Sequence, residues 1–176
     1  KPMRRLVQGD VGSGKTVVAA VSMYISAKNN TQSVLLCPTE VLAEQHFKNF
    51  SAWFKNSNIK IELLTGKMPV SKRRGIYQGL EDGVIDILIG THAVFQDKVK
   101  MKNLGLVVVD EQQRFGVKQR FDLVKKSSDQ IMPHQLFMTA TPIPRTLAMT
   151  IFADLETSKI DELPPGRKPV ETLVYR

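Results

Sequence analysis

Residues 9–16 of this chain read Gly9-Asp10-Val11-Gly12-Ser13-Gly14-Lys15-Thr16. Their order fits the pattern G-x-x-x-x-G-K-[ST], which is typical of a loop that binds nucleotide phosphates. The apolar pair Leu6-Val7 precedes the loop, and a helix-forming segment from Val17 to Ala27 follows it. This setting of strand, glycine-rich loop and helix makes a chance match in an ordinary turn the weaker alternative. The sequence therefore predicts a site for a nucleoside triphosphate.

Each part of the loop has an expected role in holding phosphate. The glycines allow the loop to curl, so that backbone N–H groups point at phosphate oxygens, and the positive end of the following helix adds to the attraction. Lys15 is expected to reach the β- and γ-phosphates, and the Thr16 hydroxyl is expected to ligate Mg²⁺. The nucleotide-binding residues are accordingly Gly9, Asp10, Val11, Gly12, Ser13, Gly14, Lys15 and Thr16.

The composition is typical of a globular protein. The chain has 176 residues, of which 42% are hydrophobic, enough for one domain with a sizeable core. It has no run of about 18 apolar residues and no visible signal peptide, so we expect a cytoplasmic location with no membrane partner. The single cysteine, Cys37, ends the apolar run Val34-Leu35-Leu36 and is expected to be a buried structural residue.

The chain is basic. Its 25 Lys and Arg residues stand against 17 Asp and Glu residues, which gives a formal net charge of +8. This excess indicates a polyanionic partner, and a solvated basic surface is the alternative. The charges gather in three clusters: Lys67, Lys72, Arg73 and Arg74; Lys98, Lys100 and Lys102; and Lys118, Arg120, Lys125 and Lys126. Several of them fall near the ends of expected strands, where ligands gather in open α/β sheets.

Apolar runs alternate with helical patterns along the chain. Strands are expected near residues 4–8, 33–37, 59–64, 85–90, 105–109 and 135–140, and helices at 14–28, 39–55, 70–81, 116–126 and 142–153. The run Leu106-Val107-Val108-Val109 is apolar throughout, as in a parallel strand that is covered on both faces. The alternation predicts an α/β fold with a mostly parallel central sheet and right-handed crossovers.

The helix expected at 39–55 shows how one face should pack. Ala43, Phe47, Phe50 and Phe54 fall on one stripe and should contact the core. Thr39 can cap the start of this helix through its hydroxyl.

From Lys159 the chain changes character. Residues 159–169 contain three prolines and a glycine, which predicts a linker that leaves the domain. Val170 to Tyr175 resembles the start of another strand. We therefore expect one domain at residues 1–159, truncated at its N-terminus because the phosphate loop comes so early. A linker and the start of a second domain are expected at residues 160–176.

A second functional signature follows the apolar run Val107-Val108-Val109. In a parallel sheet, Asp110 and Glu111 at the end of this run are expected beside the phosphate loop. Asp110 would hold the Mg²⁺ shell, and Glu111 would orient and deprotonate the attacking water. A plain turn at a strand end is the alternative, which the upstream phosphate loop disfavours. The expected catalytic residues are Lys15, Asp110 and Glu111.

A third segment reads Met138-Thr139-Ala140-Thr141-Pro142-Ile143-Pro144-Arg145 and again runs from a strand end toward an expected helix. Pro142 suits the first turn of that helix. The hydroxyls of Thr139 and Thr141 are placed to sense the γ-phosphate, although a threonine-rich turn gives the same pattern in isolation.

Together these motifs resemble those of superfamily 2 helicase motors and, within them, the RecG branched-DNA helicase family. The resemblance runs from Gly9 to about Tyr175 and includes further segments: Cys37 to His46 looks like motif Ia, Thr65-Gly66 like motif Ib, Ile89 to Ala93 like the segment after it, Asp110 to Val117 like motif II, Thr139 to Thr146 like motif III, and Asp161 to Arg167 like the RecG junction between two motor domains. It implies a three-layer RecA-like P-loop NTPase domain that uses ATP and Mg²⁺.

The resemblance also implies roles outside the phosphate loop. Coupling between nucleotide and DNA would fall to Gln113, Thr139, Thr141 and Arg145. Gln113 departs from the family, whose motif II usually has a histidine there, and a glutamine can hydrogen-bond but cannot become cationic. Contacts to DNA sugar and phosphate, along a track opposite the nucleotide face, would come from Thr39, Gln45, Thr65, Gly66, Thr91 and His92. Taken singly, His46 and His92 are typical of surface or packing positions.

The implied function is that of an ATP-dependent DNA helicase, with this chain as the first of two RecA-like motor domains. Its partners would be branched or forked DNA, such as replication forks and Holliday junctions in repair and recombination, together with the second motor domain and a DNA-reading wedge domain of the same full-length chain. We expect a monomer. This chain alone should hydrolyse ATP slowly, because the arginine finger of a second domain contributes about 10³–10⁵ in rate.

Three alternatives remain open at this point. A duplex DNA translocase like the transcription-repair coupling factor shares many of the motifs. A non-motor module could use nucleotide occupancy to switch a partner interface, and a P-loop kinase would transfer phosphate to a small molecule. The intact Lys15, Asp110 and Glu111 disfavour an inactive switch, and the third motif with the basic clusters disfavours a kinase.

Overall fold

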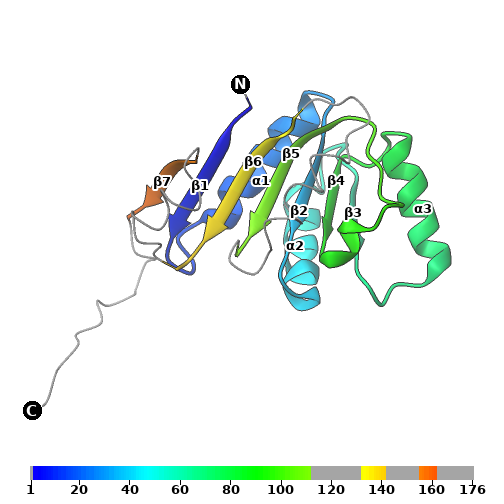
Figure 1. Cartoon of the computed structure of the whole chain (residues 1–176), viewed down its shortest axis with the longest axis horizontal. Helices are drawn as coiled ribbons and strands as arrows, with labels where there is room; N and C mark the ends of the chain where they lie inside the picture. Colours follow the sequence, from blue (N-terminus) through cyan, green and yellow to red (C-terminus); the bar gives the residue numbers. More distant parts are fainter. Residues whose placement is uncertain (1, 112–131, 142–154, 162–176) are drawn as a thin grey trace, which may run out of the picture.

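Seven parallel strands form the centre of the computed structural model, which describes residues 2–111, 132–141 and 155–161. The strands are β1 (Arg4–Gly9), β2 (Gln32–Leu36), β3 (Ile61–Leu64), β4 (Ile87–Gly90), β5 (Leu104–Asp110), β6 (His134–Thr139) and β7 (Glu156–Ile160). Their order in the sheet is β3-β4-β2-β5-β6-β1-β7, and every neighbouring pair is parallel (Figure 1). All the carboxyl ends therefore meet at one edge of the sheet.

Helices cover both faces of this sheet. They are α1 (Lys15–Lys28), α2 (Glu40–Trp53), α3 (Val70–Glu81) and the short 3₁₀ helix η1 (His92–Phe95). The predicted helices at 14–28, 39–55 and 70–81 are confirmed to within two residues, and the six predicted strands are confirmed with small shifts of their ends. The predicted helices at 116–126 and 142–153 and the strand at 170–175 lie outside the described residues.

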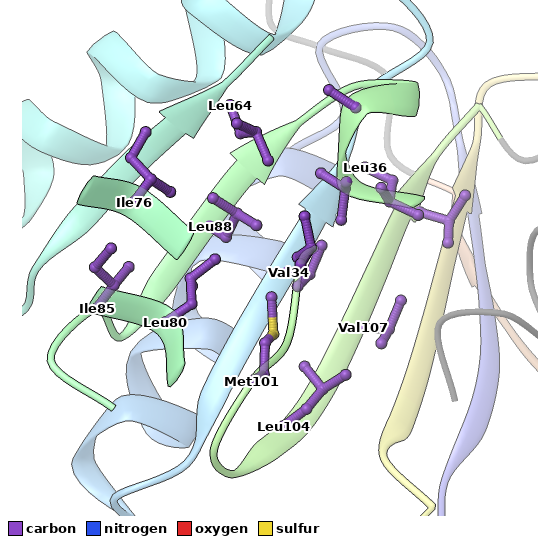
Figure 2. Close-up of a cluster of buried hydrophobic side chains, with 14 of the residues drawn as sticks. Val34, Leu36, Leu64, Ile76, Leu80, Ile85, Leu88, Met101, Leu104 and Val107 are labelled. Carbon is purple, nitrogen blue, oxygen red and sulfur yellow. The ribbon is translucent and has the colours of Figure 1, made fainter. Parts of the chain in front are cut away.

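The two faces carry separate apolar cores, which makes the domain three layers thick. On one face Ala19 and Met23 of α1 and Phe50 of α2 pack on the sheet. On the other face the core includes Ile76 and Leu80 of α3, and Figure 2 shows them beside strand residues such as Leu88 and Val34. Successive strand residues alternate between the two cores, which explains why the strands are apolar throughout.

The sequence features of α2 are confirmed. Thr39 is its N-cap, and the Thr39 hydroxyl accepts a hydrogen bond from the backbone N–H of Leu42 at 3.3 Å. Ala43 and Phe50 are fully buried, and Phe47 and Phe54 pack against the same core. The helix is thus held by a cap at its start and an aromatic stripe along its inner face.

Strand β7 is the element that the sequence analysis missed. Residues 159–160 were predicted to open a linker, but Lys159 and Ile160 complete β7, which pairs with β1. The strand is polar because it is an edge strand, and Ile160 is its partly buried contact with the core. Arg5 of β1 holds it by an ion pair with Glu156 and a 2.6 Å hydrogen bond to the Ser158 hydroxyl. Residues 162–176, including most of the predicted linker, lie outside the described residues, and the domain limit near residue 159 stays a prediction.

Two glycines provide a test of the packing at β4. A β-carbon on Gly90 would lie 2.5 Å from the backbone oxygen of Leu64. One on Gly75, inside α3, would meet no described atom within 4 Å apart from its own stretch of helix. Gly90→Ala should therefore lower the free energy of unfolding by about 1–3 kcal/mol. Gly75→Ala should raise it by about 0.4–1 kcal/mol, because alanine favours a helix. Urea unfolding of both variants checks this, and equal stability would contradict the close approach of β3 to β4.

Candidate nucleotide-binding site

The phosphate loop connects the end of β1 to the start of α1. The backbone is left-handed at Gly12 (φ 82°) and at Gly14 (φ 95°), a conformation that glycine adopts without strain. At Gly9 a β-carbon would lie 2.5 Å from the Ser13 hydroxyl oxygen, so the curl leaves no room for a side chain there. Gly14 is the N-cap of α1 and supplies no side-chain cap. The first turn of α1 thus keeps backbone N–H groups for an anion.

Lys15 lies folded over the inside of this loop. Its Nζ donates to the backbone oxygens of Gly9 at 2.5 Å and Asp10 at 2.7 Å. The Ser13 hydroxyl is enclosed and has no hydrogen-bond partner within the part of the chain that is described. Thr16 follows in the first turn of α1 and is half-buried. The loop therefore presents an ammonium group, two hydroxyls and helix N–H groups in one place, which fits a triphosphate.

The acidic pair lies at the same edge, at the end of β5. The prediction placed it beside the phosphate loop, and the structure puts one strand, β6, between β1 and β5. Two strand spacings amount to about 10 Å. Asp110 is half-buried, and Glu111 has a left-handed backbone with φ 50°, which is uncommon for a residue other than glycine. This separation leaves room for phosphate groups between the loop and the two carboxylates.

The intervening strand β6 ends in the threonine segment. Thr139 is fully buried and pairs with Gln8 of β1, while its neighbour Met138 pairs with Asp110 of β5. The backbone N–H of Ala140 donates to Glu111 Oε1 at 3.4 Å, and Gln8 Nε2 donates to the Thr141 carbonyl at 3.4 Å. The segment thus contacts both the phosphate-loop strand and the acidic pair.

Thr139 and Thr141, two of the predicted coupling residues, lie between the phosphate-loop strand and the acidic pair. The Thr141 backbone N–H donates to the Thr139 hydroxyl at 3.1 Å, which fixes the turn after β6. Gln113 and Arg145 lie outside the described residues.

His46 is the site residue that the sequence analysis did not assign. It lies on α2 with 7% of its surface exposed, and its Nε2 is 3.0 Å from Asp110 Oδ2. The edge of its ring contacts Phe50, and its Nδ1 is buried without a partner among the described residues. One sequence signal was available, because His46 falls three residues after Ala43 on the core-facing stripe, where a polar side chain needs a partner.

Cys37 is confirmed as a buried residue. It is fully buried after β2, and burial raises the pKa of its thiol, with the charge of Asp110 adding to the rise. The thiol therefore stays protonated at neutral pH and does not act as a nucleophile.

The residues predicted to contact DNA also gather at the carboxyl edge. Thr39 follows β2, Thr65 and Gly66 follow β3, and Thr91 and His92 follow β4. They were expected opposite the nucleotide face, but parallel pairing puts them on the same edge as the phosphate loop, displaced sideways across the sheet.

Exposure separates these residues into two groups. Thr65 and Thr91 are buried, at 8% and 2% exposure, whereas Thr39, Gln45 and His92 are exposed. Segments after three strands meet at Gly66, which follows β3. A β-carbon there would lie 3.5 Å from Nε2 of His92, which follows β4, and 3.6 Å from Oε1 of Glu40, which follows β2. The exposed side chains of Thr39, Gln45 and His92, together with the Gly66 backbone, can therefore contact a partner molecule at the surface.

The described residues contain neither a metal-holding cluster of side chains nor a membrane-spanning helix. Nowhere in ranges 2–111, 132–141 and 155–161 do three or more His, Cys, Asp or Glu side chains gather in a way that could hold a metal ion by themselves. Over the same ranges, no helix combines the length and apolar character that crossing a bilayer requires.

The family model and the similar proteins that match this chain are all helicases. The family model for the DEAD/DEAH box helicase matches residues 3–150. The ATP-dependent DNA helicase RecG of Haemophilus influenzae is 53% identical over 174 residues, which cover 98% of this chain and 25% of that protein. The RecG helicases of Aquifex aeolicus and Escherichia coli (strain K12) are 52% and 53% identical and cover 99% and 98% of this chain.

A solved structure agrees with these sequences. The structure of RecG bound to a three-way DNA junction matches with a TM-score of 0.80 and 44% identity, over 97% of this chain and 22% of that chain. The match confirms the predicted RecA-like α/β fold. The chain spans about a quarter of the length of the curated relatives. On these grounds the chain belongs to the DEAD/DEAH box helicase family.

Proposed function

We propose that this chain is the ATP-binding motor domain of a RecG-like DNA helicase or translocase, which couples ATP hydrolysis to the remodelling of forks and Holliday junctions. One observation carries the proposal. Three neighbouring strand ends bear the phosphate loop, the threonine segment and the acidic pair. Hydrogen bonds join the threonine segment to Gln8, just before the loop, and to Glu111 of the acidic pair. A change at the γ-phosphate can therefore reach the β6 segment directly.

The residues present fit ATP with Mg²⁺. Mg²⁺ usually takes one or two protein carboxylates or hydroxyls and completes its shell with waters and substrate phosphates. The Thr16 hydroxyl and the Asp110 carboxylate are such ligands. When bound, the ion would offset negative charge on the β- and γ-phosphates.

The remaining chemistry falls to this chain's own residues. Lys15 would exchange its two carbonyl partners for phosphate oxygens. Glu111 would orient a water and accept its proton, with its carboxylate held by the Ala140 N–H. Thr139 and Thr141 would pass the state of the site to the rest of the motor.

His46 should set the position of the Asp110 carboxylate, so its removal should weaken Mg²⁺ binding. Substitutions that remove the hydrogen-bond partner of a ligand commonly cost about 10–100-fold in metal affinity or activity. His46→Ala should raise the Mg²⁺ concentration needed for half-maximal nucleotide binding by about 10-fold. His46→Gln can still donate to Asp110 and should lose less. A Mg²⁺ titration that does not differ between wild type and His46→Ala would contradict this role.

The partners of the proposed motor come from the family. We propose forked or branched DNA, a second RecA-like domain and a wedge domain of the full-length protein, acting as a monomer in the cytoplasm. The exposed Thr39, Gln45 and His92 would contact the sugar-phosphate backbone at the carboxyl edge, with Thr65, Gly66 and Thr91 shaping that surface.

ATP hydrolysis with and without forked DNA tests the proposal. It should be measured on this chain and on a protein that extends through the second motor domain. Turnover that appears only in the longer protein and rises with DNA would support a DNA motor. Turnover that ignores DNA in both would contradict it and favour a nucleotide switch or a kinase.

A further inference from the structure

A groove lies beside α3, outside the motifs that define the proposed motor. It is a cavity of about 530 Å³ between α3 and the segment that follows η1. Two of the basic clusters, far apart in the sequence, meet in it. Its lining residues are Val70, Arg73, Arg74, Tyr77, Gln96, Asp97 and Lys98.

The groove has a fixed floor. Tyr77 and Phe95 pack against the apolar core beneath it, one from α3 and the other from η1. The Tyr77 hydroxyl donates to Gln96 Oε1 at 3.1 Å and so joins the two walls. Both walls are thus tied to the core and to each other, which fixes the distance between the backbone segments that carry the charged residues.

The charges in the groove favour an anion. Arg73, Arg74 and Lys98 are set against a single carboxylate, that of Asp97. Arg74 and Lys98 are exposed, and Arg73 is half-buried, with its Nε enclosed and lacking a partner in the described ranges. Guanidinium groups with free donors bind phosphate oxygens in charge-assisted pairs.

The position of the groove extends the row of residues proposed to contact DNA. Both walls start from the carboxyl edge, since α3 follows β3 and η1 follows β4. Figure 1 places α3 at the far side of the sheet from β1 and β7. The two strands that lead to Gly66, His92 and the groove walls are β3 and β4, which lie farthest from β1 and its phosphate loop in the sheet order.

We propose that this groove holds the phosphodiester backbone of the DNA through Arg73, Arg74 and Lys98. The inference rests on the proposed function, because it assigns one more contact to the same DNA. A base is a poorer occupant, since Tyr77 is half-buried and packs against the apolar core. Recognition would be independent of sequence.

The test is the salt dependence of affinity for forked DNA in the full-length protein. The groove variant combines Arg73→Gln, Arg74→Gln and Lys98→Gln. The control variant combines Lys28→Gln, Lys55→Gln and Lys60→Gln, three exposed lysines with the same total charge. These lie at the opposite edge, because Lys28 ends α1, Lys55 follows α2 and Lys60 precedes β3.

The groove variant should show a shallower plot of log affinity against log salt, by about 0.9 for each lost phosphate contact on duplex and so by about 2–3 in all. The control should change the slope by less than about one contact. The loss should be equal on two forks of different sequence, and ATP affinity should be unchanged.

Other outcomes overturn the inference. Equal slopes for the groove and control variants would mean that only net charge matters. An unchanged DNA slope with lost binding to an acidic peptide or to another domain would give the groove a protein partner instead. Wild type that fails to bind forked DNA would refute the proposed function itself, which is a separate result. If the triple variant does not fold, Arg74→Gln alone should still reduce the slope by about 0.9.

Discussion

Lys15→Ala should reduce ATP affinity by about 100-fold or more and leave the fold intact. A hydrogen bond to a charged group contributes about 1.5–3 kcal/mol, and Lys15 is placed to serve two phosphate groups. In the structure its Nζ bonds the carbonyls of Gly9 and Asp10. These carbonyls face the inside of the loop, so Lys15 can exchange them for phosphate oxygens without moving the backbone.

The fold should survive because other contacts hold the loop. The Ser13 backbone N–H donates to the Asp10 carbonyl at 3.1 Å, and Gly9 belongs to β1, which is paired on both sides. Calorimetric titration with ATP and thermal unfolding measure the two effects separately. Lys28→Ala, at the other end of α1, is the control for the loss of one lysine and should leave ATP affinity unchanged. Retained ATP affinity in Lys15→Ala would refute the assignment of the phosphate loop.

Much of the architecture could be predicted because the strands are covered on both faces. Residues such as Val107 and Val108 belong to opposite cores, and this produces continuous apolar runs that differ clearly from the amphipathic helices. The phosphate loop and the cap at Thr39 also depend on local chemistry, which a sequence displays directly.

The features that the sequence analysis missed depend on distant parts of the chain. Strand β7 is held by Arg5, and no periodic pattern within residues 156–160 reveals that pairing. The insertion of β6 between β1 and β5 is a matter of strand order, and the same strand order decides how far Asp110 lies from the loop. The bond from His46 to Asp110 spans 64 positions, so spacing alone could not assign it.

Glu111→Gln should keep ATP affinity within about 3-fold of wild type and lower the turnover number by about 10²–10⁴, the usual contribution of a general base. The amide oxygen of the glutamine can still accept the hydrogen bond from the Ala140 N–H. Glutamine also tolerates the left-handed backbone at this position about as well as glutamate does. The substitution therefore removes the ability to take a proton and little else.

Glu111→Ala separates proton transfer from positioning. It removes the base and also the contact with Ala140, which joins β5 to the β6 segment. If that contact carries the signal from nucleotide to DNA, Glu111→Ala should lose the tighter DNA binding that ATP induces, whereas Glu111→Gln should keep it. Single-turnover hydrolysis and DNA affinity with and without ATP, measured in the full-length protein, give both quantities. Glu81→Gln, on the exposed end of α3, serves as the control for charge. Wild-type turnover in Glu111→Gln would show that Glu111 is not the general base. Loss of ATP-dependent DNA binding in both variants would show that the signal from nucleotide to DNA depends on the carboxylate charge rather than on the hydrogen bond to Ala140.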